Sequence, residues 1–468
     1  MSLRRVRVCW RRACGRPRGA WSLAAPLLLQ ELAVVLSGAA MTLLAARLGS
    51  AAVAAIGWVE VLGQMLHALM GACAMGATVA AAQAVGAGRP GRLAALAADA
   101  LALMLALGLI LLALLWLAQD MLFALLLPGA DPAVLAHART YFQGLLWADV
   151  PAGLALVGAG LLRGMGRTGA AMRVQLAFTV TQLSTAALFM HGLDAGVPGA
   201  AAALVLSRGV ALAVALHALA PLWPGRAWPT ALARRWRRRG WAALTSRHAR
   251  AVAAVGGPTA LENIFFHLGK MLTQSLVAGL GTTAMAANFI AFALAGLMNI
   301  PGNALGAAGT TLVGQAVGAG ELARARRQML QLHRSAALVL CGLALPVALG
   351  APALVALYTA DPAVQAQAVA LIRLNAAFMP VWAASFVLPA ALRGAADSRY
   401  ALGVATASMW GCRVLLGWGL GRALGWGVTG VWLGMFADWC VRGVLFWHRA
   451  KTLPLESESR ENPSQLKR

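Results

Sequence analysis

The chain alternates between long apolar runs and short polar segments along nearly its whole length. Each run is about 20 residues or longer, which is the length that a helix needs to cross the hydrocarbon core of a bilayer. The first half holds six runs, at approximately residues 22–47, 52–80, 94–119, 138–161, 169–191 and 197–222. The second half holds six more, at approximately residues 251–279, 283–313, 329–357, 366–391, 400–421 and 425–448. The pattern predicts an all-α polytopic membrane protein with twelve transmembrane helices.

The two halves repeat the same short motifs in the same order. The hexapeptide Gln-Ala-Val-Gly-Ala-Gly occurs at Gln83–Gly88 and again at Gln315–Gly320. Three shorter motifs recur at nearly the same offset: Ala130–Val134 with Ala360–Val364, Leu162–Gly164 with Leu392–Gly394, and Gly196–Gly199 with Gly427–Gly430. Repeats of this kind indicate an internal duplication. Because six spans is an even number, we expect the repeats to be related by a pseudo-twofold axis along the membrane normal.

The duplication predicts five segments. These are a basic tail at 1–21, a first lobe at 22–222, a linker at 223–250, a second lobe at 251–449 and a tail at 450–468. The linker is rich in Arg and Trp, which is typical of a helix lying on the membrane surface and equally of an ordinary basic loop.

Composition and charge placement support a membrane protein with both termini in the cytoplasm. The chain is 60% hydrophobic and only 12% charged, whereas soluble globular chains have about 25% charged residues. The net charge is +24, but the Arg and Lys residues gather in the two tails, the linker and alternate loops. This positive-inside asymmetry predicts a multi-pass protein of the inner (plasma) membrane with cytoplasmic termini. Nucleic-acid binding would need one basic soluble face, so we expect none. The basic N-terminus also fits a cleaved signal peptide, but its removal would leave an odd number of spans.

No sequence motif indicates an enzyme, a cofactor or a metal centre. The six cysteines have no metal or redox spacing, and neither a nucleophile elbow nor a phosphate-binding loop is found. Without an ATPase motif, uphill transport would have to use an ion gradient.

Several motifs resemble those of the multidrug and toxic compound extrusion (MATE) transporters. They are Ala308–Gly320 followed by Ala323-Arg324, Pro258-x-x-x-Glu262, Gly281–Asn288 and Leu392–Asp397. The resemblance implies two six-helix lobes that export organic, often cationic, small molecules in exchange for Na⁺ or H⁺. We expect such a protein to act as a monomer. The chain departs from the family at Met41, where many members have a first-span aspartate.

Intramembrane carboxylates are the strongest candidates for coupling ions to export, because a charge inside lipid is costly. Glu262 follows Pro258 by one turn, has Asn263 beside it, and matches the acidic position of the family's second lobe. Glu31 is its counterpart in the first lobe. It is either a substitute for the aspartate missing at Met41 or a carboxylate with a purely structural partner.

Other polar side chains in the predicted spans extend the candidate site. Glu60, Gln64 and His67 share one helical face, and Asp149 lies in the fourth span. Lys270 follows Glu262 by two turns, so the sequence allows an ion pair between them. The remaining candidates are the amides Asn288, Asn299 and Asn303. Asp99 and Asp438 lie nearer span ends, where we expect solvation or salt bridges, with Arg442 as the partner of Asp438.

Two alternatives to a drug antiporter stay open at this point. A lipid-linked oligosaccharide flippase has a similar repeat architecture, but it would need several intramembrane arginines. Arg139, Arg208, Arg373, Arg413 and Arg422 are few and mostly near span edges. A membrane scaffold or enzyme has no motif in its favour.

Overall fold

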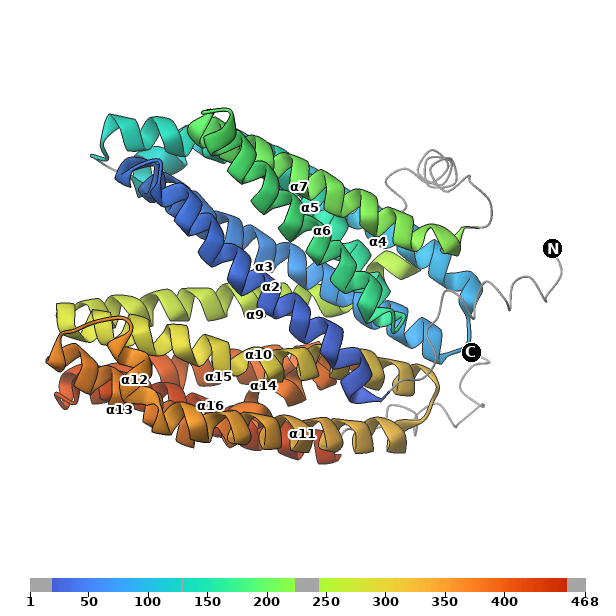
Figure 1. Ribbon diagram of the computed structural model, residues 1–468. Coiled ribbons are helices and arrows are strands. Elements are labelled where there is room, and N and C mark those ends of the chain that lie inside the picture. Colours follow the sequence, from blue (N-terminus) through green and yellow to red (C-terminus); the bar gives the residue numbers. More distant parts are fainter. Residues whose placement is uncertain (1–18, 128, 224–243, 453–468) are drawn as a thin grey trace. The chain divides into compact units, whose positions relative to one another are not determined.

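The computed structural model describes residues 19–127, 129–223 and 244–452, and every regular element in these ranges is helical (Figure 1). The first half contains α2 (Ala20–Ala46), α3 (Ser50–Gly86), α4 (Pro90–Leu126), α5 (Pro132–Gly164), α6 (Thr168–Ala187), the π-helical turn η1 (Leu188–Gly192), α7 (Gly196–Leu219) and the short turn η2 (Ala220–Leu222). The second half contains α9 (Arg247–Ala278), α10 (Thr282–Gly318), α11 (Leu322–Leu349), α12 (Ala351–Ala356), α13 (Pro362–Ala377), α14 (Met379–Gly394), α15 (Ser398–Ser408), the π-helical η4 (Met409–Leu416) and η5 (Gly419–Ala423), and α16 (Gly427–Thr452). Most of the linker, whose surface-helix and loop interpretations were both open, lies outside the described residues.

Each predicted span coincides with a helix or with two or three consecutive helical segments, which confirms the all-α prediction. Among the described residues, eight helices are long and apolar enough to cross a membrane. A ninth span is the pair α13 and α14, which meet at a bend of 59°. The other three predicted spans are α6, α9 and the α15–η5 segment. These three segments are more polar, or are interrupted by π-helical turns. They are therefore not long and apolar enough to be identified as membrane spans from length and composition alone.

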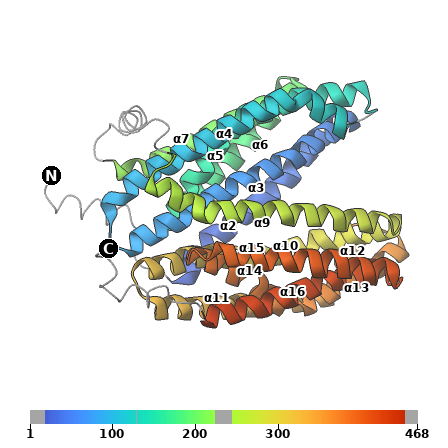
Figure 2. The same cartoon turned by 180° about the vertical axis from the view of Figure 1, so that it is seen from behind.

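Equivalent helices pack in the same way within each half. In the first half α5 lies against α3, α4 and α7, and in the second half α14 lies against α10, α11 and α16. These neighbours run side by side in both views (Figures 1 and 2). The apolar core of the first half is built from closely packed side chains such as Met70, Met104, Leu161 and Leu219.

The boundary between the two compact units of the chain falls inside α9. The first unit comprises residues 1–268 with 396–402, and the second comprises residues 269–395 with 403–468. The first turns of α9 therefore pack with the first unit. Close contacts between backbones explain this: a Cβ atom on Gly76 of α3 would overlap the carbonyl oxygen of Val252 in α9.

Both copies of the repeated hexapeptide end a long helix in the same left-handed turn. α3 and α10 stop within the motif, and Gly88 and Gly320 take φ angles of +63° and +77°. The next N–H bonds back to the helix, as Glu321 does to the Ala316 carbonyl at 2.9 Å. Glycine is favoured here because an L side chain is strained at positive φ. The hexapeptide is a helix stop, as the sequence predicted.

Two other repeated motifs supply close contacts between helices. A Cβ atom on Gly164 would overlap the carbonyl oxygen of Thr78, and one on Gly394 would lie 2.5 Å from the carbonyl oxygen of Thr310. Likewise, the last glycine of the third repeated motif, Gly199 or Gly430, lies against the backbone of the preceding π-helical turn. These glycines are required for close approach of two backbones.

The remaining repeated motif caps a helix. The side chain of Asp131 accepts a hydrogen bond from the Ala133 N–H at 2.7 Å, and Asp361 accepts one from the Ala363 N–H at 2.8 Å. An aspartate before a proline at the first helical position is a favourable N-terminus. All four repeated motifs therefore encode architecture.

Candidate functional site

A short hydrogen bond links α3 to α5 in the first unit. The hydroxyl of Tyr141 donates to Oε1 of Glu60 at 2.6 Å, and the Tyr141 side chain is fully buried. That distance is typical of a hydroxyl bonded to an ionised carboxylate. Nearby, Gly63 of α3 lies against the Leu145 side chain of α5, so the two helices are closely packed at this point. The bond holds Glu60 at a defined position inside the helix bundle.

A second carboxylate and a guanidinium lie near this pair. Asp149 follows Tyr141 by two turns of α5, is 5% exposed, and has a buried Oδ2 with no hydrogen-bond partner. Arg208 of α7 is within electrostatic reach of Glu60, Tyr141 and Asp149. Its guanidinium also lies 4.1 Å from the centre of the Phe178 ring in α6. We call Glu60, Tyr141, Asp149 and Arg208 the acidic cluster.

The acidic cluster has one more negative than positive charge when both of its carboxylates are ionised. A buried charge is costly unless it is compensated, so this arrangement favours the uptake of one proton, one metal cation or one organic cation. His67, predicted to share a face with Glu60, is also within reach of the Arg208 charge. Gln64 on the same helix is exposed and has no hydrogen bond among the described residues.

Glu31 in α2 has a cation as its neighbour. Its carboxylate is within electrostatic reach of Arg163 of α5. The adjacent Gln30 has a buried side-chain oxygen without a hydrogen-bond partner. Met41, at the position where many MATE members have an aspartate, packs against the apolar core of the first unit. That position therefore offers no ligand for an ion.

Glu262 lies in the part of α9 that packs on α3. It is 7% exposed, and the amide of the neighbouring Asn263 donates to the Ala68 carbonyl at 3.0 Å. The predicted ion pair between Glu262 and Lys270 is wrong. Eight residues of helix separate them by about 12 Å, which is too far for a salt bridge. Lys270 instead lines a pocket together with Arg413.

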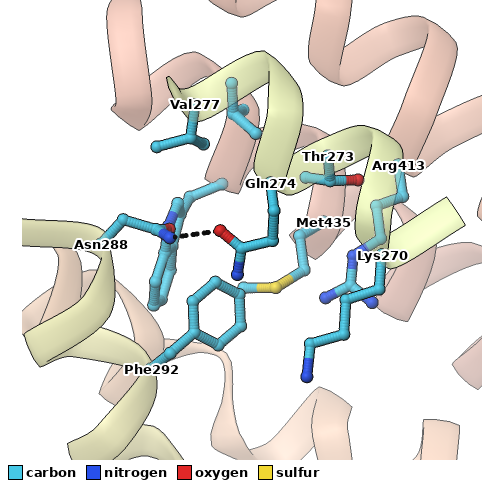
Figure 3. Close-up of a pocket in the computed structure, with 10 residues that line it drawn as sticks. Lys270, Thr273, Gln274, Val277, Asn288, Phe292, Arg413 and Met435 are labelled. Carbon is cyan, nitrogen blue, oxygen red and sulfur yellow. Dashed lines mark hydrogen bonds between the residues drawn. The ribbon is translucent and has the colours of Figure 1, made fainter. Parts of the chain in front are cut away.

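That pocket lies in the second unit, between α9, α10, η4 and α16 (Figure 3). Its empty space is about 290 Å³, including its open mouth. The lining residues are Lys270, Thr273, Gln274, Val277, Asn288, Phe292, Arg413, Val431, Trp432 and Met435. The pocket thus combines two cations with amide and aromatic groups.

The other predicted polar residues have different environments. Asn299 has a buried side-chain oxygen without a hydrogen-bond partner, whereas Asn303 is exposed. The predicted pair of Asp438 with Arg442 is confirmed, with 3.9 Å between Oδ2 and Nη1. Asp99 is not solvated: it is 1% exposed, and it accepts a hydrogen bond from Ser246 and lies 2.9 Å from the His248 ring nitrogen.

Sequence reasoning missed three residues that the structure brings into these sites. Arg208 and Arg413 were assigned to span edges, but Arg413 is 5% exposed within η4 and Arg208 is half-buried beside two carboxylates. An arginine inside an apolar run was the available signal. Tyr141 lies in a polar stretch at the start of its span, and nothing in the sequence paired it with Glu60.

Comparisons with known proteins agree with the motifs. A family model described as MatE matches residues 26–188 and 258–418, once in each half. The probable multidrug resistance protein NorM of Thermotoga maritima is 25% identical over 427 residues, covering 90% of this chain and 89% of that protein. NorM of a Synechococcus strain is 27% identical over 441 residues, covering 91% and 92%.

A solved structure shares the fold of the whole chain. A MATE protein in a straight conformation has a TM-score of 0.83 at 21% identity, covering 95% of this chain and 97% of that one. The family match occurs twice and so confirms the duplication. It also favours drug efflux over the flippase alternative. The chain belongs to the MatE family of multidrug and toxic compound efflux transporters.

Proposed function

We propose that this protein is a secondary antiporter of the inner membrane, exporting organic compounds in exchange for Na⁺ or H⁺. The observation that carries the proposal is the acidic cluster. Glu60 and Asp149 share a single guanidinium, Arg208, inside an apolar helix bundle. A site of this charge can hold one cation at a time, because the first cation removes the charge that attracts the second. Competition for one site is the simplest way to exchange a coupling ion for a cationic group.

Supporting roles follow from the neighbouring residues. Tyr141 positions Glu60, and Arg208 keeps the charge of the cluster at minus one. Glu262 and Glu31 are further coupling candidates. Glu31 lies within electrostatic reach of a cation, Arg163, which already compensates its charge. Glu31 should therefore attract a further cation less strongly than Glu262 does. We propose alternating access of the two lobes as the transport cycle, with both termini in the cytoplasm and a monomer as the working unit.

The test is ethidium accumulation in everted membrane vesicles, with a pH gradient and a Na⁺ gradient imposed separately. We expect one of the two gradients to drive accumulation, and its collapse to abolish it. Glu60→Gln and Asp149→Asn should each reduce the initial rate by at least about tenfold, since removal of a charged partner from a buried site costs about 1.5–3 kcal/mol or more. Asp120→Asn is the matched control, because Asp120 is a surface carboxylate with an 83% exposed side chain.

The outcomes are distinct. Accumulation that needs neither gradient contradicts secondary transport. Gradient-driven accumulation that is unchanged in both acidic-cluster variants contradicts the assignment of the cluster and leaves Glu262, tested by Glu262→Gln, as the coupling residue. Cysteine labelling from each side of the membrane tests the orientation of the termini.

A further inference from the structure

The pocket of the second unit has an excess of positive charge. Lys270 and Arg413 line it, and Arg442 lies near Arg413. The carboxylate within reach of these arginines is Asp438, which is fully buried and 3.9 Å from Arg442. Two cations, Lys270 and Arg413, thus line the pocket, and no carboxylate is among its lining residues. Positive charge in a low-dielectric region is costly unless an anion accompanies it.

Lys270 is the cation that remains available to a ligand. Among the described residues it forms no salt bridge and no hydrogen bond, and the charge that reaches it is that of Arg413, a second cation. Figure 3 shows the nitrogen-bearing ends of Lys270, Arg413 and Gln274 directed to the same side of the pocket. Converging donors of this kind match the oxygens of a carboxylate or sulfonate.

The polar side chains in the wall beside these donors form hydrogen bonds with one another. The Asn288 amide donates to Oε1 of Gln274 at 2.9 Å and accepts from the Trp432 indole N–H at 2.9 Å. Because its oxygen is already engaged, Gln274 has its amide N–H₂ group left to donate. The N–H₂ group of Gln274 therefore adds a donor to those of Lys270 and Arg413.

An aromatic surface completes the pocket. The rings of Phe292 and Trp432 lie 4.9 Å apart, and Met435 borders the same space. Aromatic and thioether groups are good partners for a flat ring. The space inside the pocket is narrow and opens at a mouth, so it suits the acidic end of a ligand, with the ring of the ligand lying at the mouth.

We propose that this pocket binds the anionic group of an aromatic carboxylate or sulfonate, with Lys270 and Arg413 contacting the acid and Phe292 the ring. The inference rests on the proposed efflux function and names a substrate class for it: aromatic acids, including zwitterions whose cationic end is free to bind elsewhere. The acidic headgroup of a membrane lipid offers the same chemistry, so the experiment separates these two sources.

The test measures binding of naphthoate to the full-length protein in nanodiscs of uncharged-headgroup (phosphatidylcholine) lipid, by equilibrium dialysis against empty nanodiscs. Naphthamide and naphthylmethylammonium are the neutral and cationic counterparts of the same ring. We expect naphthoate to bind about tenfold or more tightly than naphthamide, the gain of a charge-assisted hydrogen bond. Binding of naphthylmethylammonium, which the acidic cluster can also accept, should not depend on Lys270.

The variants locate the binding. Lys270→Gln should remove the preference for naphthoate, and Lys270→Arg should keep it. Lys451→Gln is the control, because Lys451 lies on a Trp447 ring at the end of α16, outside the pocket. Equal binding of naphthoate and naphthamide, or a preference unchanged in Lys270→Gln, overturns the proposal.

A second set of nanodiscs, with phosphatidylglycerol added, separates a lipid ligand from a free acid. Naphthoate binding that persists in these nanodiscs supports a soluble substrate. Anionic lipid that binds in a Lys270-dependent manner while naphthoate does not bind overturns it. Gradient-driven ethidium efflux without naphthoate binding refutes this inference alone. Lys270-dependent naphthoate binding without any gradient-driven transport refutes the proposed function alone.

Discussion

Removing the Tyr141 hydroxyl tests whether its bond positions Glu60. Tyr141→Phe deletes one oxygen atom from a side chain that is 0% exposed and keeps the aromatic ring that packs in the core of the first unit. The lost free energy is then that of the 2.6 Å bond to Glu60. Because hydrogen bonds to charged groups contribute about 1.5–3 kcal/mol, we expect the unfolding free energy to fall by about 2 kcal/mol.

The partner variant gives a different and smaller loss. In Glu60→Gln the amide oxygen can still accept from Tyr141, so a neutral bond of about 0.5–1.5 kcal/mol remains. The two variants share one bond, and their effects should therefore be less than additive, with a coupling of about 1 kcal/mol in the double variant. Efflux should respond in the opposite order, because Glu60→Gln removes the charge whereas Tyr141→Phe only loosens its position.

The assay is unfolding in mixed detergent micelles, followed by circular dichroism, for the wild type, both single variants and the double variant. Tyr358→Phe is the control, because Tyr358 is 49% exposed and a surface substitution changes stability by less than about 0.5 kcal/mol. A Tyr141→Phe variant as stable as this control would refute the reasoning. The reasoning would also be refuted if Tyr141→Phe lowered the unfolding free energy equally in the wild type and in the Glu60→Gln variant.

Three further predictions concern the helix ends and contacts. Ala396 has a φ of +66° where the first half has Gly166, so Ala396→Gly should stabilise the protein and Gly166→Ala destabilise it, each by about 1 kcal/mol, as measured by unfolding in micelles. Gly164→Ala should cost about 1–3 kcal/mol because its Cβ atom would overlap a carbonyl of α3, whereas Gly169→Ala, with open space around it, should not destabilise. Asp99→Asn should lower the unfolding free energy by about 1–3 kcal/mol, because it weakens the bonds that tie the start of α9 to α4, and should increase proteolysis near residue 246.

The architecture was accessible from sequence because it depends on local patterns. Apolar runs predict spans, and the repeated motifs predict the duplication, whereas the close contact at Gly164 was found only in the structure. The spans and the duplication need no knowledge of distant partners. The two-segment spans were not predicted, since the bend between α13 and α14 depends on packing that the run of apolar residues does not reveal.

The sites were only partly accessible, because their chemistry depends on contacts between distant segments. Glu60 was found by its cost in lipid, but its partner Tyr141 lies 81 residues away, in another helix. Lys270 was found and given the wrong partner, since spacing on one helix suggested Glu262. Arg413, on η4, shares its pocket instead. Distance along a helix is predictable, whereas the neighbour from the next helix is not.

The duplication makes the difference in charge between the halves informative. α3 and α10 have 37 residues each and end in the same hexapeptide, so Glu60, the eleventh residue of α3, corresponds to Phe292, the eleventh of α10. By the same alignment of α5 with α13 and α14, Asp149 corresponds to Met379. The two carboxylates of the acidic cluster thus correspond to apolar residues in the second half.

The second half instead has two cations lining its pocket, whereas the cations at the sites of the first half, Arg163 and Arg208, each lie within reach of a carboxylate. Lys270 and Arg413 line its pocket, and Phe292 lies between them and Trp432. The two halves therefore share a backbone plan but differ in local charge: the acidic cluster of the first half has a net negative charge, whereas two cations line the pocket of the second. The acidic cluster suits the cationic group of a substrate and the pocket suits an anionic group, and two identical units could not offer both kinds of site. The two halves have the same helix arrangement but different charges at their sites. This difference is the strongest reason to expect substrates that carry both a positive and a negative charge.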